Sequence, residues 1–251
     1  MSAVELIEIF NAQSGVISCV GAGGKKTTMF RLAEAHTGRV GITATAHIEF
    51  FPKTLDASCY IGDEDALLQA ISVDKDSRVM AFARPSSRFG RRAGISPDAV
   101  ARFKAAGNFD LMVIKADGAR SRFIKAPAPH EPVLSPSTDT IIPVLSAKVI
   151  GQPLCKEIVH RVELFSELVG LEENGEITPE HVARLLSSGQ GSLKDVGKAT
   201  VIPLINMVDD KQLQEVATRA AELALDMTDR FDRVVLAAMK KDDPIVRVIE
   251  R

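Results

Sequence analysis

Strong charge of one sign is missing from this sequence. Its 31 lysine and arginine residues face 33 aspartate and glutamate residues, which leaves a net charge of −2. Because the charges nearly cancel, nothing draws the whole surface toward nucleic acid or an anionic membrane. We therefore expect neither a nucleic-acid partner nor a membrane partner, and any binding site has to be found in local sequence.

Long apolar runs are also missing, and cysteine is scarce. No run approaches the roughly 20 apolar residues that cross a bilayer. Residues 1–13 contain two acids and lack the basic start of a signal peptide. The three cysteines, Cys19, Cys59 and Cys155, lie far apart, without the close spacing that predicts a disulfide framework or a zinc site. We expect a cytoplasmic protein with reduced thiols.

The sequence does contain buried-strand patterns that alternate with helical ones. Its 251 residues are 45% hydrophobic, enough for one sizeable core. Continuous apolar runs predict strands covered on both faces, so we predict a three-layer α/β fold of the P-loop NTPase kind, with a mostly parallel sheet. We expect a single domain over residues 1–251, with a small helical insertion at about 146–200. The expected strands are 15–20, 39–46, 78–83, 109–114, 139–145, 199–205 and 232–239, and the expected helices are 4–12, 27–36, 96–107, 160–170, 178–188 and 211–227.

A glycine-rich stretch, GAGGKKTT, lies between the first expected strand and the next helix. In a phosphate-binding loop, backbone N–H groups wrap the phosphates, a lysine reaches the terminal phosphates and a hydroxyl holds Mg²⁺. A helix N-terminus that faces the loop favours anion binding here, and a plain strand-to-helix turn with two chance lysines is the alternative. The predicted phosphate-binding residues are Gly21, Ala22, Gly23, Gly24, Lys25, Lys26, Thr27 and Thr28.

Two alignments with the phosphate-loop pattern are open. If Lys25 is the phosphate lysine, Cys19 takes the place of the first glycine and Lys26 that of the hydroxyl. If Lys26 is the phosphate lysine, Thr27 supplies the hydroxyl but Lys25 replaces a glycine. Both alignments predict a nucleotide, ATP or GTP, as the ligand.

Asp117 stands just beyond the strand expected at 109–114. The second acid motif of P-loop NTPases has this placement, and its carboxylate positions Mg²⁺ and water. We predict that Asp117 acts in catalysis together with Lys25, and that Asp117 and Thr27 are the metal ligands if Mg²⁺ binds. An ordinary Asp-Gly turn is the alternative.

Polar residues also follow the second expected strand, in TATAHI. Thr45 and His47 are predicted at the carboxyl ends of the strands, where ligands of open α/β sheets bind. They would contact the nucleotide or a second substrate. The alternative is that the threonines reflect β propensity and that the histidine is structural.

The proline-stiffened stretch RSRFIKAPAPHEP concentrates charge after the acid motif. We predict that Arg120 and Lys125 bind an anionic substrate, with His130 or Glu131 as the proton-transfer group. A solvated surface loop is the alternative. A second stretch, ARPSSRFGRR, adds Arg88, Arg91 and Arg92 to the same basic rim.

The stretch INMVD carries Asn206 and Asp209 at the spacing of the guanine-reading NKxD element. Lysine is replaced by Met207, so only part of that chemistry is present. Both residues are predicted to bind the nucleotide. The alternative is that Asp209 caps the following helix.

Taken in order, VGAGGKKTTMFRLA, TATAHI, KADGARSRFIKAPAPHEPV and INMVD resemble the motifs of the YqeC family. That family typically reads GAGGKT followed by Ser or Thr, then TTTTHI, EADG, LKAP, HEPVIP and an NKxD-like element. The resemblance covers nearly the whole chain, and the block from ADGA to HEPV is its most specific part. It implies a nucleotide-binding fold and an accessory role in maturing selenium-dependent molybdenum hydroxylases, with such an enzyme or a selenium-cofactor biosynthesis protein as partner.

Two departures from the family pattern concern the metal. Lys26 replaces a hydroxyl, and Lys115 stands where the family has glutamate. At 4 Å and an effective dielectric of about 20, two unit charges interact by about 4 kcal/mol, so a lysine opposes a dication by roughly twice that. We hypothesise that lysines supply part of the metal's charge here, and that hydrolysis is slow or absent.

Three functions therefore compete. The first is an accessory nucleotide-binding protein with NTPase activity of the P-loop class. The second is a small-molecule kinase or ligase that uses the His130–Glu131 loop. The third is a binding module that keeps the fold without metal chemistry, which Lys26 and Lys115 favour over the second.

Overall fold

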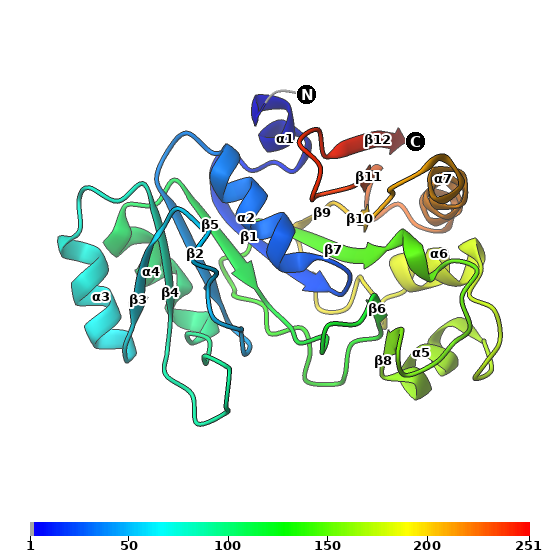
Figure 1. The fold of residues 1–251 in the computed structure, drawn as a ribbon, viewed down its shortest axis with the longest axis horizontal. Helices are drawn as coiled ribbons and strands as arrows, with labels where there is room; N and C mark the ends of the chain where they lie inside the picture. The colour runs from blue at the N-terminus through cyan, green and yellow to red at the C-terminus, as the bar shows by residue number, and fades with distance from the viewer. Residues whose placement is uncertain (1–2) are drawn as a thin grey trace.

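The protein is built on one large sheet, and a computed structural model describes its residues 3–251 (Figure 1). The strands of this sheet are β1 (Gly15–Gly21), β2 (Val40–Ala44), β3 (Ser58–Ile61), β4 (Val79–Ala83), β5 (Leu111–Lys115), β7 (Thr140–Ser146), β9 (Thr200–Val201), β10 (Leu204–Asn206), β11 (Arg233–Ala237) and β12 (Ile245–Glu250). Their order is β12-β11-β10-β7-β1-β5-β2-β4-β3, and β9 pairs with β7. Only β12 runs antiparallel to its neighbour. The prediction of a mostly parallel sheet is confirmed.

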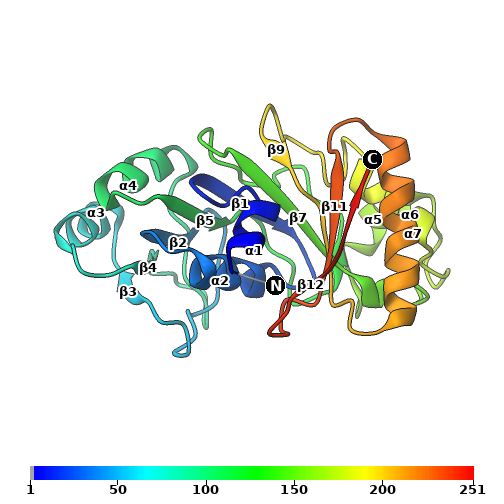
Figure 2. The same cartoon turned by 90° about the horizontal axis from the view of Figure 1, so that it is seen from above.

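Helices cover both faces of the sheet. They are α1 (Ala3–Ile9), α2 (Lys25–Ala35), α3 (Glu64–Val73), α4 (Val100–Gly107), α5 (Val162–Val169), α6 (Pro179–Ser187) and α7 (Lys211–Met227). The side chains of β1 alternate, so Ile17 and Cys19 pack with α1 and α2 while Val16 and Val20 pack on the opposite face. That opposite face carries α3 and α4 at one end and α5 to α7 at the other (Figure 2). The three-layer prediction is confirmed.

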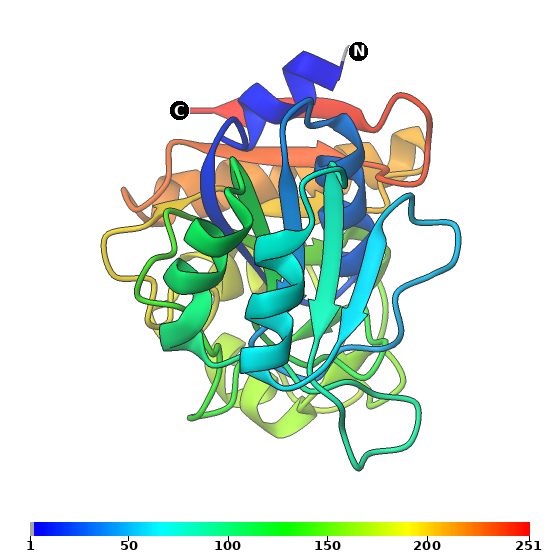
Figure 3. The same cartoon turned by 90° about the vertical axis from the view of Figure 1, so that its left-hand side faces the viewer.

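Several elements were not predicted. Figure 3 shows α3 beside β3 and β4. No element was expected where α3 and β3 lie, between the strands expected at 39–46 and 78–83. The edge strand β3 alternates between half-buried and exposed residues, so it has no continuous apolar run. The single strand expected at 199–205 is instead two, β9 and β10, separated by Ile202 and Pro203, because proline has no N–H to donate to the ladder.

The helix-rich part of the chain, about 146–200, packs against the sheet. It contains α5, α6 and the short strand β8 (Val159–His160), which pairs with β6 (Ile124–Lys125). Side chains of α5 and α6 share one apolar cluster with α7 and with β7, β10 and β11. Among residues 3–251, no helix is both long and apolar enough to span a bilayer.

The sheet has a switch point between β1 and β7. From β1 the chain passes through α2 to β2, on the far side of β5, whereas from β7 it passes to β10 on the other side. In open α/β sheets such a point leaves a crevice at the carboxyl ends of the strands. The glycine-rich stretch follows β1 and lies at this point.

Candidate functional site

The glycine-rich loop is short and packs tightly. Strand β1 ends at Gly21 and α2 begins at Lys25, so only residues 22–24 lie between them. Cys19, which one alignment placed at the start of a phosphate loop, is a strand residue paired with β5 and β7. A Cβ on Gly21 would lie 2.3 Å from the carbonyl oxygen of Val144 in β7. The glycines therefore permit close approach to β7.

Part of the loop backbone is already hydrogen-bonded. The N–H of Gly21 donates to Asp117 Oδ2 at 2.8 Å, and those of Ala22 and Gly23 donate to carbonyls. The N-cap residue of α2 is Gly24, so no side chain caps this helix. The N–H groups of the first helical turn, at residues 25–27, have no acceptor within residues 3–251. The free donors are therefore at the N-terminus of α2.

Lys25 points inward rather than toward solvent. Its side chain is buried, its Nζ donates to the carbonyl oxygen of Gly21, and the same atom lies 3.0 Å from Asp117 Oδ1. Burial lowers the pKa of Lys25 by more than Asp117 raises it. Asp117 Oδ1 receives no hydrogen bond within the described chain, so this contact is an ion pair.

A chain of ion pairs continues from Asp117. Lys125 Nζ lies 2.9 Å from Asp117 Oδ2 and 2.6 Å from Glu131 Oε2, and Arg161 Nη1 lies 2.6 Å from the same glutamate oxygen. Burial would raise the pKa of Glu131, but Lys125 and Arg161 outweigh it and lower this pKa to about 2. Glu131 is therefore an ionised structural partner at neutral pH.

Lys115 is a buried ammonium that has no carboxylate partner within residues 3–251. Its Nζ donates to the carbonyl oxygens of His47 at 2.6 Å and Asp117 at 2.5 Å. An ammonium has three N–H donors, and no atom of residues 3–251 accepts the third. Burial, and then the positive charge of Lys25, lower the pKa of Lys115 to about 7.

These residues form one group, which we call the lysine cluster: Lys25, Lys115, Lys125, Arg161, Asp117 and Glu131. It holds four basic side chains and two carboxylates, so positive charge is in excess. A magnesium ion does not fit Asp117 as it lies here, because both carboxylate oxygens face ammonium groups. In residues 3–251 no three His, Cys, Asp or Glu side chains gather as a metal site.

The other residues expected at the loop are placed at its edges. Lys26 pairs with Glu49, which Arg91 also contacts at 2.9 Å. Thr28 is buried and its hydroxyl donates to the carbonyl of Gly24 at 3.3 Å. Thr27 is half-buried in the first turn of α2.

The structure places the predicted substrate residues in different surroundings. Thr45 donates to the carbonyl oxygen of Val133 at 2.5 Å, which ties the strand-end segment to the HEPV block. Lys125 belongs to the lysine cluster. Arg120 and His130 are exposed, so His130 is not brought beside the buried carboxylate of Glu131.

Asn206 holds the loop from β10. Its Nδ2 donates to the carbonyl of Gly23 at 2.9 Å, and its Oδ1 accepts the N–H of Met239 at 3.0 Å. Asp209 pairs with Lys148 at the surface. The helix cap that was the alternative role for Asp209 is made by Asp210, which accepts from the N–H of Leu213 at 2.8 Å.

Arg161 was not predicted. It is the N-cap residue of α5 and has a left-handed backbone, φ 67°, and no local motif marks it in the sequence. Gly191 and Ser192 also escaped notice, although they line a small cavity together with Gly21, Asp117 and Lys125. Only the fold brings these segments to the loop.

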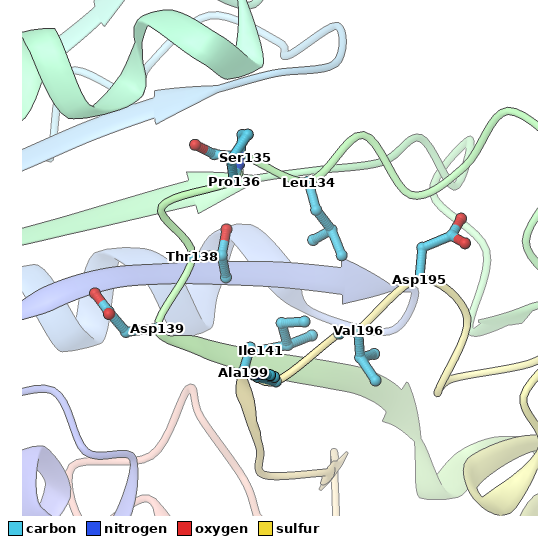
Figure 4. A pocket seen from close by; sticks show the side chains of 11 residues that line it. Leu134, Ser135, Pro136, Thr138, Asp139, Ile141, Asp195, Val196 and Ala199 are labelled. Atoms are coloured by element: carbon cyan, nitrogen blue, oxygen red, sulfur yellow. The ribbon is translucent and has the colours of Figure 1, made fainter.

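A second cavity, of about 370 Å³, lies at the opposite ends of the strands (Figure 4). Its walls are residues 134–136, 138 and 139, which precede β7, Ile141 at the start of β7, and residues 195–199, which precede β9. Asp139 at this cavity accepts the N–H of Val16 at the start of β1, at 2.8 Å. The cavity is therefore at the amino ends of the strands and separate from the glycine-rich loop.

Fold and site together define an α/β protein with a short glycine-rich loop and a buried lysine cluster at the switch point of a parallel sheet. A family model described as YqeC protein matches residues 17–163. The chain is 32% identical over 184 residues to a protein of Escherichia coli (strain K12) described as "Uncharacterized protein YqeC", covering 72% of this chain and 71% of the relative. The chain belongs to the YqeC family, which confirms the prediction from its motifs.

Proposed function

We propose that the protein binds the phosphate groups of a nucleotide, ATP or GTP, at the N-terminus of α2. The observation that carries this proposal is the excess of positive charge in the lysine cluster, next to the free N–H groups of residues 25–27. Buried charges normally have counter-ions, and a phosphate supplies negative charge and acceptors together.

Each group has a distinct part in this binding. The first-turn N–H groups would donate directly to the phosphate oxygens. Lys25 would move from the carbonyl of Gly21 to the phosphate, while Lys115 adds positive charge from behind the loop. Asn206 keeps the loop in place through Gly23, so its amide is already used and it gives little support to guanine reading.

Slow turnover, or none, follows from the same arrangement. Asp117 has both oxygens beside ammonium groups, and Glu131 stays ionised down to about pH 2, so neither carboxylate suits a general base at neutral pH. These observations favour a binding module over a kinase or ligase. From the resemblance of its motifs, we place this binding in an accessory role during maturation of selenium-dependent molybdenum hydroxylases, with such an enzyme or a selenium-cofactor protein as partner.

Calorimetric titration tests the proposal. ATP, GTP, ADP and GDP are titrated with and without Mg²⁺ into the wild type, Lys25→Met and Lys211→Met. The control lysine, Lys211, also begins a helix but is exposed. We expect wild-type affinity to change less than about threefold without Mg²⁺, and Lys25→Met to weaken binding by at least about tenfold, since a charge-assisted contact is lost.

The comparison of variants makes the result decisive. Equal affinities of Lys25→Met and wild type, or no binding by the wild type, would contradict phosphate binding at α2. Rapid phosphate release that requires Mg²⁺ would contradict the lysine-substituted site and restore Asp117 and Thr27 as metal ligands. A preference between ATP and GTP would decide the base.

A further inference from the structure

Two loops near the carboxyl ends of β2 and β4 form a basic rim, which we define as residues 46–53 and 84–92. Figure 1 shows the second loop projecting beyond the end of β4. The rim holds five basic side chains and one acid, Glu49. The basic side chains are Lys53, Arg84, Arg88, Arg91 and Arg92.

The two loops are held together by backbone and side-chain contacts. Ile48 and Arg92 form an antiparallel bridge, with N···O distances of 3.0 and 2.7 Å. The guanidinium of Arg92 lies 4.5 Å from the centre of the Phe50 ring. Arg91 contacts Glu49, so the acid of the rim is already paired. These contacts fix the arginines relative to the 46–50 segment.

His47 lies where the rim meets the lysine cluster. Its carbonyl accepts Lys115 Nζ at 2.6 Å, so the buried ammonium borders the histidine backbone. The charged groups that act on its half-buried ring are Lys115 from β5 and Arg88 and Arg91 from the other loop. Glu49, two residues further along the same segment, pairs with Arg91. Burial and then these three cations lower the pKa of His47, so the imidazole is neutral at physiological pH.

We propose that His47, Lys115, Arg88 and Arg91 form a second anion-binding site, beside the glycine-rich loop, for a phosphate or carboxylate group of a second substrate. The site rests on the proposed function in one respect: nucleotide phosphate occupies α2 and leaves the rim for another ligand. Arg88 is exposed and has no carboxylate partner within the described residues, and Lys115 retains one unused N–H. These groups supply the donors for a small anion.

The recessed ammonium favours a small anionic group over an acidic protein surface. Lys115 is only 8% exposed, so a flat partner surface cannot reach it. The ligand that we propose is therefore a single phosphate or carboxylate group. Phe89 at the loop tip is fully exposed and gives the bound molecule an apolar contact. Arginine suits such a site because its planar guanidinium binds both oxyanions through two hydrogen bonds.

The titration of His47, followed by NMR, tests the site. The five histidine signals are assigned with His47→Gln, and the midpoint of His47 is measured with phosphate, with acetate, and with sodium chloride at equal ionic strength. We expect phosphate or acetate to raise the midpoint by about one pH unit, because a bound anion favours the imidazolium. A rise with phosphate alone assigns a phosphate group, one with acetate alone a carboxylate, and one with both a site that takes either.

Variants distinguish this second anion-binding site from the phosphate site at the glycine-rich loop. Arg88→Gln/Arg91→Gln should abolish the rise, whereas Arg102→Gln/Arg219→Gln, which removes two exposed arginines from α4 and α7, should preserve it. Lys25→Met should also preserve it, so a failure of nucleotide binding leaves this result standing. The proposal would be overturned by a midpoint that matches the chloride sample, or by a rise that survives in Arg88→Gln/Arg91→Gln.

Discussion

Asp117 is the residue on which the lysine cluster depends. Its carboxylate accepts the N–H of Gly21 and lies within 3.0 Å of both Lys25 and Lys125. Burial raises its pKa, but the two lysines outweigh burial and leave the pKa of Asp117 below its ordinary value. Removing one partner of a buried ion pair is costly because the remaining charge stays buried.

We predict that Asp117→Asn destabilises the protein by about 3 kcal/mol, since two ammonium groups lose their counter-ion. The free energy of unfolding, measured in urea, checks this value. Asp209→Asn is the matched control, because its exposed pair with Lys148 contributes about 0.5 kcal/mol or less. A loss below about 1 kcal/mol in Asp117→Asn would mean that the cluster tolerates the extra positive charge.

Among the elements, the strand–loop–helix unit of β1 and α2 places the donors. The loop turns in three residues because Gly21, Gly23 and Gly24 have φ of 89°, 77° and 129°, a region that other residues enter at a cost. Close packing on β7 and on Asn206 then fixes the start of α2. The N-terminus of α2 consequently faces the lysine cluster.

Gly21→Ala should destabilise the protein by about 3 kcal/mol, because the new Cβ would combine a strained φ with a 2.3 Å approach to the backbone of β7. Gly90→Ala shares the positive φ but has open space around it, so we expect a loss of about 1 kcal/mol. Urea unfolding of both variants gives the comparison. Equal losses would show that packing on β7 adds nothing to the backbone strain.

For the whole molecule, the lysine cluster links stability to pH. The amine of Lys115 has an ordinary pKa of 10.5 in the unfolded chain, whereas in the folded protein burial and Lys25 lower this pKa to about 7. Between these values the unfolded state holds more protons, so the free energy of unfolding rises with pH. Below pH 7 both states are protonated and the full penalty for burying the charge remains.

Lys115→Met should remove this dependence. We expect the difference in the free energy of unfolding, wild type minus variant, to rise by about 3.5 kcal/mol between pH 7 and pH 10. Denaturant unfolding across this range measures it, with Lys211→Met as an exposed control whose curve should run parallel to the wild type. A Lys115→Met curve that runs parallel to that of the wild type would contradict the lowered pKa of Lys115.

Much of this organisation was predictable from local sequence. Strands buried on both faces give continuous apolar runs, which identified β1, β2, β4, β5, β7 and β11, and the 3.6-residue period identified α7 with its observed bounds. Edge strand β3 gave no such signal. Helix α3 was missed although Asp63 caps it and its buried residues, Leu67 and Ile71, are four positions apart. The stability of β3 and α3 comes from contacts with β4 and with each other, which local pattern does not contain.

The sequence determined the α/β class, the family, the glycine-rich loop and the position of Asp117 after a strand, because each of these depends on residues close together in the chain. The tertiary structure alone decided how Lys25, Lys125 and Arg161 are paired. Parallel strands bring their carboxyl ends to one edge of the sheet, and residues more than a hundred positions apart then share one buried, low-dielectric environment. Charge balance in that environment is a property of the assembled group.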